Sequence, residues 1–496
     1  MKMRPAIIIG SGVAGMAAAT RLSVAGFSVT VYEKNSYPGG KLSFFETQGY
    51  QFDAGPSLFT QPENIEELFK FAGEDITEFF TYKKLDSACE YFFENGKKVT
   101  AFTDTQLFAA EIAEKTGQPA AAVTQYLLSA KNLYNKIGGI FLNYSLHKYS
   151  TWLHPRTLKA LSALKPGYLF KTLHGYNSNK FSSPEVTQLF NRYATYNGSN
   201  PYAAPAMLSV IPHLEQNEGA FYPQGGMSSI TNALYKLAIK KGVQFKFNTP
   251  VQRLIHHEGK VKGVVTDGGN FFADTIISNG DIYFTYEKLL GHSPKAKKIL
   301  KQERSSSALI FYWGINKKFP ALQLHNIFFS KNYREEFDHI FLKKSSYADP
   351  TVYVNITSKM ESGHATPGGE NWFVMINVPA NAGQNWPRVI QETKKNILEK
   401  MERILGESIE PFIETEDILD PLQIEEKTGS YRGSLYGSSS NSKMAAFFRP
   451  ANFTNYIKNL YFCGGSVHPG GGIPLCFKSA KIATELIIRD FKKQRN

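Results

Sequence analysis

The sequence predicts an α/β fold in three parts: a parallel-sheet domain, an interrupted α+β domain and a helical subdomain. Three observations support this prediction. A strand, a glycine-rich turn, a helix and a second strand follow one another within residues 1–33. A second glycine-rich turn between a strand and a helix lies at residues 464–474. The mixed blocks between these turns resemble a second domain inserted twice into the first.

The N-terminal pattern starts with a short apolar run at residues 6–9, which is typical of a buried strand. An alanine-rich run at residues 16–25 predicts a helix. Residues 29–32 form a second strand that finishes at Glu33. This order of elements, with an acid at that distance, is typical of a Rossmann-like dinucleotide site.

The glycines of the turn Gly10-Ser-Gly12-Val-Ala-Gly15 have separate tasks. Gly10 permits the tight turn, Gly12 lets the backbone approach a pyrophosphate, and Gly15 lets helix and strand pack closely. The amides and the positive dipole at the helix N-terminus favour phosphate charge. The Glu33 carboxylate can accept hydrogen bonds from both ribose hydroxyls.

Composition and cysteine usage limit the class of protein. The 496 residues are 42% hydrophobic and 20% charged, as in an ordinary globular protein. Cys89, Cys463 and Cys476 are too few and too scattered for a disulfide framework or a zinc site, which favours free thiols in a reducing cytoplasm. We expect no metal site, and no apolar stretch reaches the roughly 18 residues that a membrane-spanning helix needs.

The net charge of +13 is unevenly distributed, because no acidic residue occurs between Glu114 and Glu185. Basic and aromatic side chains are interleaved there instead. The basic residues include Lys131, Lys136, Lys148, Arg156, Lys159, Lys165, Lys171 and Lys180, and the aromatic residues include Tyr134, Phe141, Tyr144, Tyr149, Trp152, Tyr168 and Phe170. A helix-like apolar spacing is added by Leu128, Leu133, Ile137, Ile140 and Phe141.

This combination predicts that residues 116–184 dock on an anionic membrane surface. One alternative is a basic helical subdomain with a solvated face. Another is nucleic-acid binding, but no recognition motif is present, so we expect no nucleic-acid partner. The expected location is the cytoplasm, at the periphery of the inner membrane.

The remaining chain divides into blocks. Residues 62–216 look helical and less regular, and residues 228–241 predict a helix. Strand candidates are residues 243–247, 251–256, 261–266, 271–277, 307–314, 372–378 and 459–463, and later helix candidates are residues 387–405 and 477–489. The nucleotide-binding domain is assigned to residues 1–75, 217–290 and 420–496, and the substrate-binding domain to residues 76–115, 185–216 and 291–419.

The distance between the two glycine clusters distinguishes between dinucleotides. NAD needs a second mononucleotide half close behind the first. Here the second cluster lies at the far end of the chain, which favours an extended FAD. Its ADP part would lie on the first turn and its flavin ring near Gly472, where amides at a helix start stabilise negative charge on the reduced flavin.

On these motifs the chain resembles the bacterial-type carotenoid desaturases, the phytoene desaturase group of the flavin amine-oxidase superfamily. The resemblance rests on Gly10 to Gly15 with Glu33, Gly39-Gly40-Lys41, Phe52-Asp53-x-Gly55-Pro56, Tyr222-Pro223-x-Gly225-Gly226-Met227 and residues 459–474, of which His468 to Pro474 are the most specific. It implies an FAD cleft lined by Gly39, Gly40, Lys41, Gly55, Pro56 and Ser57, with Val251 near the adenine and Gly464, Gly465, Gly472 and Ile473 beside the phosphate, ribityl and flavin.

The resemblance also implies a reaction, the dehydrogenation of a saturated carbon pair in an acyclic C40 polyene. A hydride passes to the flavin and a proton leaves the adjacent carbon, while the protein positions the C–H bond and excludes water. Phytoene-type desaturation and 3,4-desaturation of a 1-hydroxycarotenoid are both open, as is the electron acceptor, oxygen or a quinone. No catalytic base can be assigned, because His147, His154, His174 and His213 stand in no motif.

Two other functions occur on the same fold. Amine oxidases usually carry an acid directly after the glycine that ends the last strand, whereas this chain has Gly465, which disfavours an amine or protoporphyrinogen oxidase. Prenyl-binding carriers, such as the Rab escort proteins, have lost the nucleotide signature that is intact here. Both remain alternatives to the desaturase.

Overall fold

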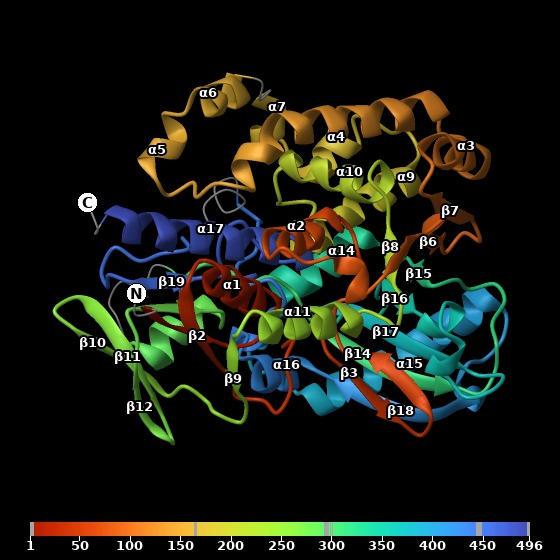
Figure 1. The fold of residues 1–496 in the computed structure, drawn as a ribbon. Helices are drawn as coiled ribbons and strands as arrows, with labels where there is room; N and C mark the ends of the chain where they lie inside the picture. The colour runs from red at the N-terminus through yellow and green to blue at the C-terminus, as the bar shows by residue number, and fades with distance from the viewer. Residues whose placement is uncertain are drawn as a thin grey trace.

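The computed structural model describes residues 4–162, 166–291, 297, 299, 301–442 and 449–493. A parallel five-stranded sheet has the strand order β19-β13-β1-β2-β9 (Figure 1). Its strands are β1 (Arg4–Ile9), β2 (Phe27–Tyr32), β9 (Gln244–Lys246), β13 (Thr275–Ser278) and β19 (Leu460–Phe462). The predicted α/β fold is confirmed, and its parallel sheet combines strands from the N-terminal, middle and C-terminal parts of the chain.

Three helices pack on this sheet: α1 (Val13–Val24), α11 (Ser228–Lys240) and α17 (Ile473–Lys493). Small buried residues such as Ala17 and Ala18 let α1 approach both the strands and α17, which runs beside it (Figure 1). The helices α1 and α17 begin several residues earlier than predicted, because each starts directly after its glycine-rich turn. The N-terminal amides of α1 therefore lie within the predicted phosphate turn.

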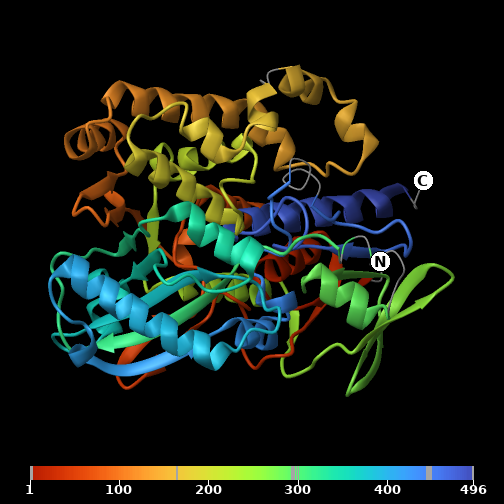
Figure 2. The ribbon, with the colours of Figure 1, turned by 180° about the vertical axis from the view of Figure 1, so that it is seen from behind.

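A second, largely antiparallel sheet has the order β18-β14-β17-β16-β15-β6-β7. Its strands are β6 (Ser87–Phe92), β7 (Lys98–Phe102), β14 (Ser307–Ile315), β15 (His325–Phe328), β16 (Val352–Asn355), β17 (Glu370–Val378) and β18 (Ile413–Leu419). Helix α15 (Trp386–Leu405) lies across one face of this sheet (Figure 2). The predicted strands at residues 307–314 and 372–378 and the helix at 387–405 are confirmed.

Alternation along these strands divides the side chains between the two faces of the sheet. On β14, Leu309, Phe311 and Trp313 pack in the same core as α15. The intervening Ile310 and Tyr312 point to the opposite face and belong to another cluster. The seven-stranded sheet therefore has one face in the core and one face available to a cavity.

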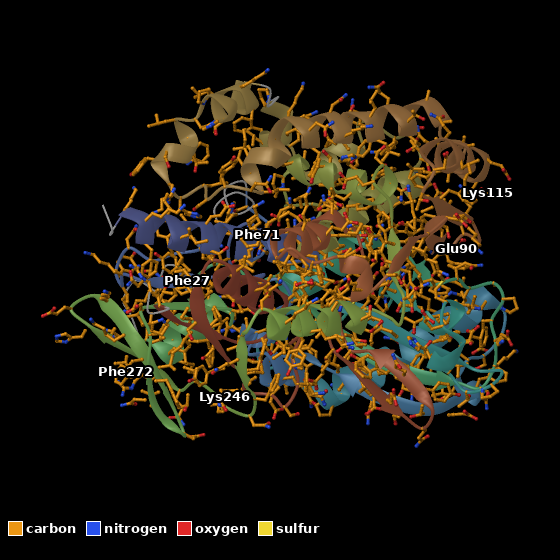
Figure 3. All side chains as sticks on the ribbon, viewed as in Figure 1. Phe27, Phe71, Glu90, Lys115, Lys246 and Phe272 are labelled. Carbon is orange, nitrogen blue, oxygen red and sulfur yellow. The ribbon has the colours of Figure 1, made fainter. Side chains whose placement is uncertain are left out.

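Two predictions of secondary structure are wrong. The block at residues 62–216 contains the hairpin β6–β7 and also β5 (Tyr82–Lys84), which pairs with β8 (Phe221–Pro223). The predicted strand at 271–277 is two strands in different sheets, β12 (Gly269–Phe272) and β13. Strand β12 completes an antiparallel ribbon with β10 (Arg253–His257) and β11 (Lys260–Thr266), from which Phe272 projects (Figure 3).

A helical layer lies above both sheets (Figure 1). Its helices include α3 (Thr105–Thr116), α4 (Ala120–Phe141), α5 (Tyr149–Trp152), α6 (Pro155–Ser162), α7 (Pro166–Phe170), α8 (Leu173–Asn177), α9 (Pro184–Asn191) and α10 (Ile211–Gln216). Among the described residues, no helix has both the length and the hydrophobicity to cross a bilayer.

The apolar spacing on α4 has a different role from the predicted one. Leu133, Ile137, Ile140 and Phe141 are buried in a local core with Met207. Their spacing therefore reflects packing between helices and does not form a membrane-facing surface. Among the described residues of that segment, the exposed apolar side chains are Leu128, Tyr144, Tyr149, Leu153, Leu158 and Phe170, while Lys165 lies outside the described residues.

Candidate active site

The two glycine-rich turns meet at the carboxyl ends of neighbouring parallel strands. Strands β1 and β19 pair with opposite edges of β13, which is followed by Asn279. The Asn279 Nδ2 atom donates a hydrogen bond to the carbonyl oxygen of Cys463 at 3.2 Å. A Cβ atom on Gly12 would lie only 2.7 Å from Asn279 Oδ1. This crevice is the place where open α/β sheets bind ligands.

Gly15 has a packing role in the structure. Its Cβ would lie 2.2 Å from the Gly10 carbonyl oxygen, so no larger residue fits between α1 and the end of β1. The loop at residues 39–41 runs alongside the same turn, and the Gly39 amide donates to the carbonyl of Ser11 at 2.9 Å. The glycine segments at residues 10–15 and 39–41 therefore both expose backbone atoms to the same cavity.

Glu33 is buried at the end of β2 and holds the first turn in place. Its Oε2 accepts hydrogen bonds from the Ser11 amide at 2.7 Å and the Ser11 hydroxyl at 2.8 Å, and its Oε1 accepts from the Asn35 amide at 2.9 Å. Nearby, Lys41 Nζ donates to the carbonyl of Leu435 at 2.8 Å, and burial lowers the pKa of this ammonium group.

A cavity of about 840 Å³ extends from these turns to the open face of the seven-stranded sheet. This volume lies in the upper part of the range for ligand pockets, about 300–1,000 Å³. The predicted cofactor-binding residues that line it are Gly10, Gly12, Glu33, Gly39, Gly40, Lys41, Gly55, Pro56, Ser57, Val251, Gly464, Gly465, Gly472 and Ile473. Gly15 does not line it, because it lies between helix and strand.

Hydrogen bonds join three of the sequence motifs to other parts of the fold. The Asp53 carboxylate accepts hydrogen bonds from the amides of Met227 (3.0 Å) and Ser228 (3.2 Å), so two motifs from distant parts of the chain meet. Burial raises the pKa of Asp53 to about 6. On the C-terminal turn, His468 Nε2 lies 2.9 Å from the carbonyl oxygen of Tyr144 and joins that turn to the helical layer.

The half of the cavity farther from the two glycine-rich turns, here called the apolar half, is lined mainly by apolar side chains. The face of the seven-stranded sheet that points away from α15 contributes Ile310, Tyr312, Ile327, Phe373 and Met375. These are the alternate residues to those in the α15 core. Such a lining favours a hydrocarbon and excludes water.

Polar residues that line this half but were not found from the sequence include Arg192, Glu215 and His325. They come from separate elements and stand in no motif, so no local signal marks them. The four histidines considered from the sequence, His147, His154, His174 and His213, are not among the described residues that line this cavity.

The half of the cavity beside the two glycine-rich turns, here called the nucleotide half, has the features that FAD requires. Gly10, Gly12 and Gly40 leave backbone accessible where phosphates must approach, and the N-termini of α1 and α17 favour negative charge. Glu33 provides a buried carboxylate at the position expected for a ribose. A Cβ on Gly465 would lie 3.2 Å from the Gly471 Cα, so a larger side chain there would require the turn to move.

Comparisons with known proteins agree with this geometry. The family pattern described as flavin containing amine oxidoreductase matches residues 13–488. The chain is 51% identical to a 1-hydroxycarotenoid 3,4-desaturase from a Flavobacterium species, covering 98% of this chain and 99% of that protein. It is 30% identical to a phytoene desaturase from Fusarium fujikuroi, covering 98% and 89%. An oxidoreductase structure from Methanosarcina mazei has the same fold, with a TM-score of 0.62, 15% identity and coverage of 98% and 100%.

Proposed function

The chain belongs to the family of flavin-containing amine oxidoreductases, and we propose that within this family it desaturates an acyclic carotenoid. It is an FAD-dependent oxidoreductase. The observation that carries the proposal is a single cavity with a glycine-lined nucleotide half and an apolar half on the seven-stranded sheet. The identity to a 1-hydroxycarotenoid 3,4-desaturase supports 3,4-desaturation of a 1-hydroxylated substrate as the specific reaction.

The residues of the two halves have distinct tasks in this reaction. The turns at Gly10, Gly39 and Gly464 bind the dinucleotide, and Glu33 contacts its ribose. When bound, FAD supplies the acceptor for the hydride that leaves the substrate. Side chains such as Ile310 and Phe373 hold the polyene in one orientation and keep water from the reacting carbons.

An anaerobic assay with purified holoenzyme tests this function. Addition of a 1-hydroxylated acyclic C40 carotenoid should bleach the flavin absorbance, and chromatography should show a product with one more double bond. The same protein should remain yellow with a diamine such as putrescine. Bleaching by the diamine, or none with any carotenoid, would contradict the proposal. Admitting oxygen or a quinone afterwards identifies the acceptor that restores the colour.

We also propose that the helices α5 to α7 dock on an anionic lipid surface at the periphery of the membrane. A long polyene does not dissolve in water, so the enzyme must collect it from lipid. Tyr149 and Phe170 on these helices are 89% and 67% exposed, and Leu153, directly after α5, is 78% exposed. Exposed Lys171 follows directly, and each such cation adds about 1 kcal/mol near an anionic surface.

Vesicle sedimentation tests the docking surface. The protein should sediment with phosphatidylglycerol-rich vesicles more than with phosphatidylcholine vesicles, and high salt should weaken the association. A variant with Tyr149→Ser and Leu153→Ser should bind about 10-fold less, because apolar area no longer enters the interface. The matched control is Leu342→Ser, at a side chain that is 74% exposed outside this segment. Equal loss in both variants would contradict a surface located on α5 to α7.

A further inference from the structure

The apolar half of the cavity contains a polar corner, which we define as Arg192, Thr195, Glu215, His325 and Tyr353. These residues come from the 3₁₀ helix η2 (Arg192–Asn197), α10, β15 and β16. The Arg192, Glu215 and His325 residues are 8%, 2% and 3% exposed. Charged and polar groups are thus buried in a space otherwise suited to a hydrocarbon.

Glu215 is the best-satisfied member of the polar corner. Its carboxylate accepts hydrogen bonds from Arg192 Nη2 (2.9 Å), the Tyr193 hydroxyl (2.8 Å), Gln216 Nε2 (3.2 Å) and the Tyr196 hydroxyl. Burial alone raises the pKa of this carboxyl, but the Arg192 charge and these hydrogen bonds hold it below its ordinary value. Glu215 is therefore ionised and fixed.

Arg192 has an unpaired donor at Nε. Its Nη2 also donates to the Tyr91 hydroxyl at 2.5 Å, and its guanidinium lies 4.5 Å from the centre of the Tyr193 ring. The Nε–H group, however, has no hydrogen-bond partner among the described residues. A buried donor without a partner is costly, because it has lost its hydrogen bond to water.

His325 offers a second unpaired donor. His325 Nδ1 lies 2.7 Å from the Tyr353 hydroxyl and 3.1 Å from Asn355 Nδ2, which also donates to the Leu324 carbonyl at 3.0 Å. Because an amide nitrogen can only donate, Nδ1 is an acceptor. Burial lowers the pKa of His325 to about 4, and the neutral ring therefore carries its proton on Nε2. This Nε2–H group has no partner among the described side chains.

The polar corner also has an acceptor. The Thr195 hydroxyl donates to the carbonyl of Arg192 at 2.8 Å, which leaves its own lone pairs for another donor. An alcohol needs this combination, one donor to its oxygen and one acceptor for its hydrogen. A methyl-terminated hydrocarbon in the same position would leave both N–H groups unpaired.

We propose that the polar corner is a hydroxyl-binding subsite that selects polyenes carrying an alcohol at one end. The inference rests on the proposed carotenoid desaturation and assigns residues to its substrate specificity. The substrate oxygen accepts from His325 Nε2 or Arg192 Nε, and its hydrogen is donated to Thr195. Sites that hydrogen-bond a substrate hydroxyl can reject analogues without it by factors of about 10⁴, so a preference of about 100-fold is a modest expectation.

The test compares two substrates that differ only by the hydroxyl, a 1-hydroxylated acyclic carotenoid and the same carotenoid without it. Rates of anaerobic flavin bleaching give kcat/KM for each. Wild-type enzyme should prefer the alcohol about 100-fold. The variant Arg192→Met with Glu215→Gln removes both charges together, since removing one would leave the other buried and unpaired. We expect its preference to fall below about 5-fold, mainly through loss of activity on the alcohol.

A matched double variant controls for the loss of an ion pair. Lys97→Met with Glu185→Gln removes a pair that is 2.6 Å apart and lies outside the residues that line the cavity, and it should keep the wild-type preference. If the Arg192 variant fails to bind FAD, the variant His325→Leu tests the subsite instead. We expect its preference for the hydroxylated carotenoid to fall about 10-fold.

The outcomes separate the subsite from the proposed function. An unchanged preference in the polar-corner variants would overturn the subsite, and so would an equal loss on both substrates, which indicates a general structural or catalytic role. If wild-type enzyme oxidises neither carotenoid, the proposed function itself fails. If it oxidises both equally well, desaturation stands and the subsite does not.

Discussion

Replacement of Gly15 by alanine will give a protein that does not retain FAD. The new Cβ would lie 2.2 Å from the Gly10 carbonyl oxygen and 2.8 Å from Asn279 Oδ1. The first of these atoms is backbone at the end of a buried strand, so it cannot rotate away. Relief of the clash must move α1 away from β1, which opens the phosphate turn. We expect a stability loss of about 3 kcal/mol and a flavin-to-protein absorbance ratio close to zero.

The matched control for this substitution is Gly139→Ala. Gly139 lies within α4, and a Cβ there meets no atom within 4 Å. Alanine is favoured over glycine in a helix by about 1 kcal/mol, so the variant should keep its flavin and unfold at the same or a higher temperature. Full flavin content in the Gly15→Ala protein would contradict the packing role assigned to this glycine.

Replacement of Glu33 by alanine will weaken FAD binding by about 100-fold or more. The carboxylate fixes Ser11 and Asn35 through three hydrogen bonds, and it lines the cavity where the ribose is expected. Loss of hydrogen bonds to a charged group costs about 1.5–3 kcal/mol each, and the freed Ser11 amide belongs to the phosphate turn itself. Titration of apoprotein with FAD, followed by flavin fluorescence, measures the dissociation constant.

Two further variants make the Glu33 result specific. Glu33→Gln keeps the shape and one acceptor oxygen, so its affinity should lie between those of wild type and Glu33→Ala. Glu46→Gln removes an exposed carboxylate on β3 (Phe44–Thr47), outside the cavity lining, and should leave the affinity unchanged. An unaltered dissociation constant in Glu33→Ala would show that this carboxylate does not contact the nucleotide.

The nucleotide half could be predicted because its geometry depends on residues that are close together in the sequence. The spacing of Gly10, Gly12 and Gly15 and the acid at Glu33 are determined by one turn and one helix start, which lie within a few residues of each other. The second glycine cluster could be recognised in the same way, as a turn between a strand and a helix. The structure places both clusters on one cavity. The division into domains with the predicted bounds stays a prediction, as does FAD binding by the individual residues.

The substrate half could not be predicted, because it depends on long-range pairing. Arg192, Glu215 and His325 meet only after β15 joins β6 and the helical layer packs above them. The sequence does hold one local signal for the hairpin: Asn95-Gly96 lies in the turn between β6 and β7, and such a dipeptide between alternating runs is typical of a hairpin. On α4, the same helical spacing of apolar residues is expected for a protein core and for a membrane-facing surface. Only the contacts with Met207 show that these residues belong to a core.

The parallel sheet has a consequence for biosynthesis. Strand β19 joins β13 only after residues 460–462 have left the ribosome, and residues 464–473 then complete the wall of the nucleotide cavity. We therefore expect a nascent chain to bind its flavin only after this step, even where its first 33 residues have already folded. Pigmentation of the protein thus reports that translation has passed this strand, and prematurely terminated polypeptides should stay colourless.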